Sequence, residues 1–111
     1  MQMVIVADVP SAGETEGMKA HRSANIRNNL GVALFDRAVS KQEHGQKDAA
    51  ARCFGCARAE LERAVTALPD ARSLNNLGVV KWAQREVDGA KRCFDRALEA
   101  ERDHAAATFN A

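Results

Sequence analysis

The five-residue word NNLGV occurs twice in this chain of 111 residues, at 28–32 and again at 75–79. The same word at two places in so short a chain indicates that one structural unit is repeated. From Ala24 onward, apolar residues also recur at helical spacing, which gives each segment one apolar face. A repeated unit built from amphipathic helices predicts an all-α fold.

Breaks in the apolar spacing divide this part of the chain into helices. The sequence HGQ at 44–46 interrupts the first helix, and Pro69 ends the second because proline cannot continue a helix. Asp70 and Asp88 are candidate N-caps of the third and fourth helices, and a fifth is expected to begin near His104. Short connections between successive helices predict antiparallel hairpins. The predicted hairpins cover about residues 24–68 and 71–101.

The second hairpin resembles the tetratricopeptide repeat, a helical pair of about 34 residues. The residues that carry the resemblance are Leu77, Gly78, Ala90, Phe94 and Ala97. The first hairpin has the same pattern at Leu30, Gly31, Ala57, Leu61, Ala64 and Pro69. The resemblance implies hairpins stacked as a short right-handed solenoid, with Gly78 and Ala90 small where two helices cross and Phe94 between hairpins. It is incomplete, because Lys81 stands at an aromatic position of the family and Arg102 replaces its closing proline.

This resemblance divides the chain into a tail and repeat units. The first unit, residues 24–70, has about 13–14 more residues than the family's repeat, whereas the second covers 71–104 and a partial third covers 105–111. Because the apolar spacing continues through the insertion, we expect two lengthened helices there rather than a loop. Residues 1–23 combine the β-prone sequence VIVADV with Pro10, Gly13 and Gly17, which predicts an extended or flexible tail.

The paired asparagines of the repeated word are candidate binding residues. In the family that the chain resembles, the position of Asn29 and Asn76 lines a concave groove, and Asn110 falls at the same place in the third unit. The resemblance implies that such amides bind the backbone of an extended peptide, and an amide suits this task because it donates and accepts hydrogen bonds. The predicted groove residues are Asn28, Asn29, Val32, Phe35, Arg72, Asn75, Asn76, Val79, Trp82 and Asn110. Their apolar and aromatic character predicts a ligand with hydrophobic anchors, and the chain's own MVIVADV is one candidate.

Other binding chemistries find less support. The clamp for acidic C-terminal peptides found in related chaperone adaptors needs positive charges, but Asn28, Val32, Ala106 and Asn110 stand at its matching positions. Cys53 and Cys56 form a CxxC sequence, yet they lie within an apolar helical stripe, where cysteine is a well-tolerated core residue. We therefore favour structural packing for them over a metal site or redox chemistry.

Composition narrows the classes of function. Sixteen Lys and Arg against fifteen Asp and Glu leave a net charge of +1 without long runs of one sign, which argues against nucleic acid or a membrane as partner. The start of the chain lacks the pattern of a signal peptide, so a cytoplasmic location is expected. We find no catalytic or cofactor-binding motif and expect neither enzymatic activity nor a cofactor.

The prediction is a non-catalytic protein–protein interaction module, an adaptor or scaffold, that binds an extended peptide or partner protein in its groove. The alternative is a self-associating structural module, such as a homodimer, or a fragment of a longer repeat array. In that case another copy or missing repeats would cover its open C-terminal face. A metal-binding regulator is the third alternative and ranks below these two.

Overall fold

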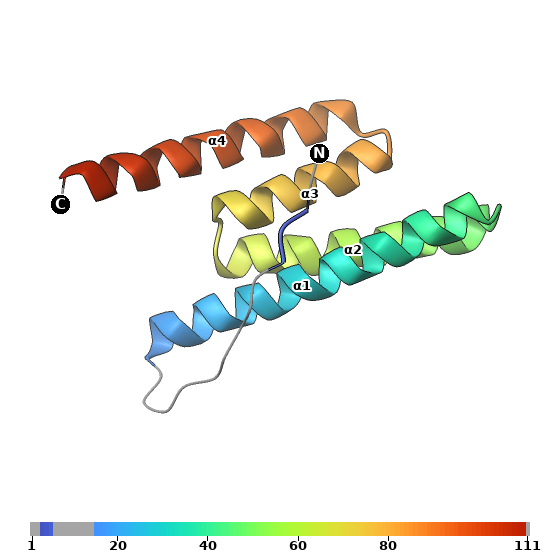
Figure 1. Cartoon of the computed structure of the whole chain (residues 1–111), viewed down its shortest axis with the longest axis horizontal. Coiled ribbons are helices and arrows are strands. Elements are labelled where there is room, and N and C mark those ends of the chain that lie inside the picture. Colours follow the sequence, from blue (N-terminus) through green and yellow to red (C-terminus); the bar gives the residue numbers. More distant parts are fainter. Residues whose placement is uncertain (1–2, 6–14, 111) are drawn as a thin grey trace.

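The structure is a computed structural model that describes residues 3–5 and 15–110, without the side chains of 105–110. Its described residues form two antiparallel helical hairpins, which stack side by side (Figure 1). The helices are α1 (Glu16–Glu43) and α2 (Lys47–Ala67) in the first hairpin, and α3 (Ala71–Ala83) and α4 (Val87–Asn110) in the second. No strand occurs among the described residues, which confirms the predicted all-α fold of stacked hairpins.

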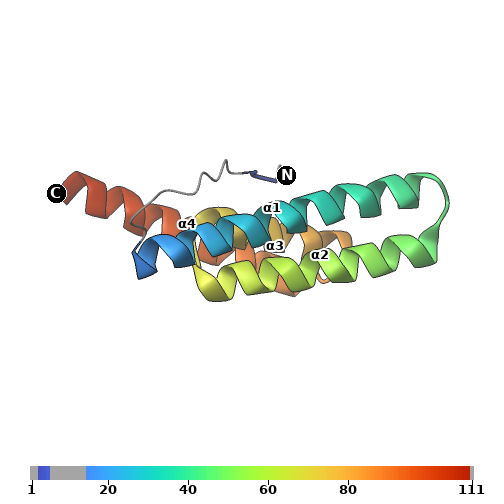
Figure 2. The same cartoon turned by 90° about the horizontal axis from the view of Figure 1, so that it is seen from below.

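The inserted residues of the first unit lengthen both of its helices, as predicted. α1 continues to Glu43 and α2 begins at Lys47, so the α1–α2 turn extends well beyond the α3–α4 turn (Figure 2). Gly45 occupies the turn with a φ of 74°, a left-handed conformation that glycine adopts at little cost. The extension has its own small core of Ala38, Ala50 and Phe54, and the rings of Phe35 and Phe54 meet edge to face with centroids 5.6 Å apart.

Two predicted boundaries are wrong. α1 begins at Glu16 rather than Ala24, because the Thr15 hydroxyl caps it by accepting a hydrogen bond from the Met18 N–H at 3.1 Å. Gly17 lies in the first turn and does not break the helix. α4 continues as one helix to Asn110, so no fifth helix starts near His104 and residues 105–110 begin no third hairpin. The reason is that neither glycine nor proline follows Gly89 in the chain.

Small residues in equivalent places let the helices of each hairpin approach closely. A Cβ atom on Gly31 would lie 2.6 Å from the Leu61 Cγ, and one on Gly78 would lie 2.7 Å from the Phe94 Cε1. Leu61 and Phe94 occupy the same position of the repeat pattern, although the first hairpin has more residues between its glycine and that position. Phe94 therefore packs against α3 of its own hairpin, whereas we expected it between the hairpins. The two hairpins therefore share the same close contact between their helices.

The main core lies where the two hairpins meet. Ala57 and Leu61 of α2 pack with Leu77 and Val80 of α3, and Cys93 of α4 joins them. All are buried, so this cluster joins the two hairpins as one body.

Asp70 is the N-cap of α3, as predicted. Its Oδ1 accepts a hydrogen bond from the Ser73 N–H at 2.9 Å, and its Oδ2 lies 2.8 Å from the Arg72 Nη2. Asp88, by contrast, lies in the first turn of α4, which begins at Val87. Partial burial raises the pKa of the Asp70 carboxyl, but the Ser73 N–H and the Arg72 guanidinium outweigh burial and leave the pKa below its ordinary value.

We expect Asp70→Ala to lower the free energy of unfolding by about 1 kcal/mol near neutral pH, because α3 loses its cap. A carboxyl with a lowered pKa stabilises the fold above its unfolded pKa of about 3.9, and this contribution disappears as the pH falls through the folded pKa. Urea unfolding at several pH values should therefore show the two proteins converging in acid. Asp70→Asn keeps an acceptor for the Ser73 N–H and should recover most of the loss. An undiminished difference in acid would contradict this assignment.

Candidate functional site

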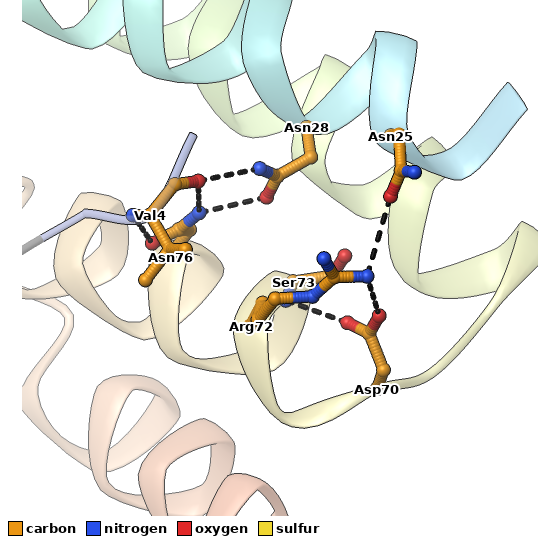
Figure 3. Close-up of polar contacts among 7 residues, drawn as sticks. All are labelled: Val4, Asn25, Asn28, Asp70, Arg72, Ser73 and Asn76. Atoms are coloured by element: carbon orange, nitrogen blue, oxygen red, sulfur yellow. Dashed lines mark hydrogen bonds and ion pairs between the residues drawn. The ribbon is translucent and has the colours of Figure 1, made fainter. Parts of the chain in front are cut away.

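Two asparagine side chains meet between the first helices of the two hairpins. Asn28 lies on α1 and Asn76 on α3, and the Asn76 Nδ2 donates a hydrogen bond to the Asn28 Oδ1 at 2.7 Å (Figure 3). Only 2% of Asn28 and 0% of Asn76 are exposed. A buried amide is stable only when its polar atoms are hydrogen-bonded, so the pair must be satisfied by its surroundings.

The backbone of Val4 supplies the remaining partners of this amide pair. The Val4 N–H donates to the Asn76 Oδ1 at 3.0 Å, and the Val4 carbonyl accepts from the Asn28 Nδ2 at 2.7 Å and the Asn76 Nδ2 at 3.1 Å (Figure 3). Asn76 thus binds both polar backbone groups of a single residue, much as a neighbouring strand would. These hydrogen bonds reach only the backbone of Val4, so they do not depend on the identity of its side chain.

The residues beside Val4 add apolar contact. Residues 3–5 are not helical, and Met3 packs against the main core cluster that joins the hairpins. Ile5 is exposed and Val4 is partly so. The segment is therefore held by one partly buried apolar side chain and by the backbone hydrogen bonds of the next residue.

A second polar cluster bridges α1 and α3 further along the same helices. The Arg72 Nη2 donates to the Asn25 Oδ1 at 3.3 Å and also reaches Asp70, the cap of α3 (Figure 3). We expected Arg72 to supply the cation of the groove, but in the structure its guanidinium joins two helices. Asn25 was missed in the sequence because it lies outside the repeated word.

The other predicted groove residues are dispersed. Val32 and Val79 are buried, Phe35 is partly buried against Phe54, and Trp82 is half-exposed at the end of α3. Asn110 lies at the end of α4, and its side chain is outside the described residues. Since α4 does not turn there, Asn110 does not occupy the place in a third unit that its position predicted.

The amides that bind Val4 are not the matched pair that the repeat suggests. Asn29 and Asn76 share one position in the repeat, but Asn28, one residue earlier, is the partner of Asn76. Successive residues of a helix point about 100° apart. α3 lies on one side of α1 and α1 lies on the opposite side of α3, so the two helices meet through different residues of the repeated word. Asn29 and Asn75 are both partly buried beside this site.

The three cysteines form no disulfide and differ in how far each is buried. Cys93 is buried in the main core, Cys53 packs against the small core of the extension, and Cys56 is exposed. Among the described residues, no three His, Cys, Asp or Glu side chains gather as metal ligands would. None of the described helices combines the length and apolar character that crossing a membrane requires.

Comparison with known proteins identifies the second hairpin. Residues 71–104 match the sequence model of the tetratricopeptide repeat, and this range covers all of α3 and most of α4. No curated protein and no solved structure matches the chain. Repeats of this kind stack helical pairs into extended surfaces for protein interaction. The helical pair and the packing of Gly78 against Phe94 agree with this match of the second hairpin to the tetratricopeptide repeat.

Proposed function

We propose that the chain is a non-catalytic protein-interaction module that binds an extended peptide segment between α1 and α3. One observation carries this proposal: Asn28 and Asn76 together bind the N–H and the carbonyl of Val4. We take residues 3–5 as the example of such a segment, because they are extended rather than helical and lie against both amides.

The chemistry of the site defines its ligand. The amide pair binds backbone, so it tolerates different side chains at the central residue. Selectivity comes from the preceding residue, whose side chain packs on the apolar cluster as Met3 does. The ligand class is therefore a short extended segment with an apolar anchor directly before the residue that the amides bind.

The chain's own residues 3–5 compete with any partner for this site. A partner segment binds only to molecules in which these residues have left, and its apparent affinity falls in proportion to that fraction. Residues 3–5 therefore determine the fraction of molecules whose site can bind a partner segment.

A peptide-binding measurement tests the proposal. A chain lacking residues 1–12 should bind a synthetic peptide of residues 1–12, and the full-length chain should bind it at least about tenfold more weakly. Isothermal titration calorimetry would measure both affinities. Absence of binding to the shortened but folded chain would refute the proposal.

A modified peptide isolates the contact with Asn76. N-methylation of Val4 removes the N–H donor and keeps every side chain, so it should leave the buried Asn76 Oδ1 without its partner. We expect affinity to fall about 5- to 30-fold, which corresponds to about 1–2 kcal/mol. The matched control is N-methylation of Gln2, which removes one backbone N–H from the same peptide and leaves the Val4 N–H in place. Equal loss from both modifications would contradict the specific role of Val4.

A further inference from the structure

The two edges of the hairpin stack carry exposed apolar stripes. On α1, Ile26 and Leu30 are about half-exposed and lie one turn apart, whereas α4 carries Val87 and Leu98 with partly buried Phe94 between them. α1 and α4 lie at opposite edges of the stack (Figure 1), and within the described residues they make no contact with each other. Apolar residues grouped on an exposed helix face indicate an interaction surface.

These two stripes correspond in the repeat pattern to the two faces that pack together between α2 and α3. Leu30 occupies the repeat position of Leu77, and 43% of Leu30 is exposed against 5% of Leu77. Leu77 is buried because α3 packs on α2. The exposed face of α1 is thus a second copy of the α3 face that binds α2.

The same holds for the opposite edge. Leu98 of α4 occupies the repeat position of Val65 of α2, as the matched contacts of Leu61 with Gly31 and of Phe94 with Gly78 establish. Val65 packs against the cluster that joins α2 to α3, while Leu98 is 52% exposed. The exposed face of α4 is therefore a second copy of the α2 face that binds α3.

The helix lengths fit this arrangement. α1 begins at Glu16, ahead of Ala24, which is the repeat position where α3 would begin. α4 continues to Asn110, past Ala100, which is the repeat position where α2 would end. Both extensions project toward the same side of the molecule (Figure 1). When α1 of one copy packs on α4 of another as α3 packs on α2, the two extensions run side by side.

We propose that a second copy of this chain is the partner of these stripes, stacked head to tail so that α1 of one copy packs on α4 of the next. The interface joins two different surfaces, so each added copy exposes a new stripe and assembly is open-ended. It uses faces outside the peptide site and stands independently of the proposed function.

Complementary variants test this arrangement. Leu30→Glu places a charge in the α1 stripe and Leu98→Glu places one in the α4 stripe. In sedimentation velocity, the wild-type chain should grow with concentration, whereas each variant alone should remain a monomer. An equimolar mixture should form a dimer of twice the monomer mass and grow no further, because only one pair of intact faces remains.

Controls separate assembly from folding. Ala59→Glu adds the same charge at an exposed position of α2 outside both stripes and should leave assembly unchanged. Circular dichroism should show that all variants are folded. A wild-type chain that stays monomeric at every concentration, or a mixture in which the two variants fail to pair, would overturn the proposal.

Discussion

Replacing Gly31 with alanine should destabilise the protein by about 1–3 kcal/mol, because the new methyl group has no room. A Cβ at this position would lie 2.6 Å from the Leu61 Cγ and 2.9 Å from its Cδ2. Leu61 is fully buried in the cluster that joins the hairpins, so it cannot move aside without disturbing α3 as well. The better helix propensity of alanine offsets this loss of unfolding free energy by only about 0.5–1 kcal/mol. Chemical unfolding monitored by circular dichroism measures the difference.

Gly55→Ala is the matched control, with an effect of opposite sign. Gly55 is an exposed residue within α2, and nothing lies within 4 Å of a Cβ built on it. Alanine there should stabilise the protein by about 0.5–1 kcal/mol through helix propensity alone. Gly78→Ala should fall between the two, because its neighbour Phe94 is only partly buried and can shift. A Gly31→Ala protein as stable as the Gly55→Ala protein would contradict the close approach of α1 and α2.

Removing both amides that bind Val4 should weaken peptide binding about 10- to 50-fold. Asn28→Ala with Asn76→Ala deletes every side-chain hydrogen bond that the site makes to the Val4 backbone. The loss of these three hydrogen bonds, two of which share the Val4 carbonyl, at a net value of about 0.5–0.75 kcal/mol each, gives this range. The measurement uses the chain lacking residues 1–12 and the peptide of residues 1–12. Because both residues are buried, the affinity must be referred to the folded fraction.

Asn29→Ala tests whether Asn28 or Asn29 acts together with Asn76 in binding Val4. Asn29 shares the repeat position of Asn76, yet Asn28 makes the contact with Val4. In the Asn29→Ala chain, N-methylation of Val4 should therefore still weaken binding about 5- to 30-fold, whereas in the Asn76→Ala chain it should have little effect. Loss of this sensitivity in Asn29→Ala together with its retention in Asn76→Ala would reverse the assignment.

Local patterns were sufficient to predict most of the fold. Apolar spacing and the paired small residues predicted the helices, their pairing and the lengthened first hairpin. The errors arose where a boundary depends on one local contact or on the absence of a breaker. The Thr15 cap starts α1 early, and the stretch after Ala97 contains no glycine or proline to end α4.

The site was less predictable because it depends on how one hairpin faces the other. Side-chain chemistry indicated that asparagines would bind backbone, and Asn76 does so. The repeat pattern alone favoured Asn29 as its partner, because equivalent positions look alike in sequence. Stacking places the two copies of NNLGV differently. α1 and α3 turn opposite sides toward the site between them, so a different asparagine of each copy reaches it. This asymmetry selects Asn28, and the same asymmetry leaves Arg72 engaged with Asn25.

Hydrogen exchange at the Val4 amide tests the central claim most directly, since that N–H either is or is not held by Asn76 in solution. In the full-length chain, NMR should show this amide exchanging at least about tenfold more slowly than in the isolated peptide of residues 1–12. Asn76→Ala should return it to the peptide's rate, whereas Asn29→Ala should leave it protected. A Val4 amide that exchanges at the peptide's rate in the wild-type chain would contradict the account.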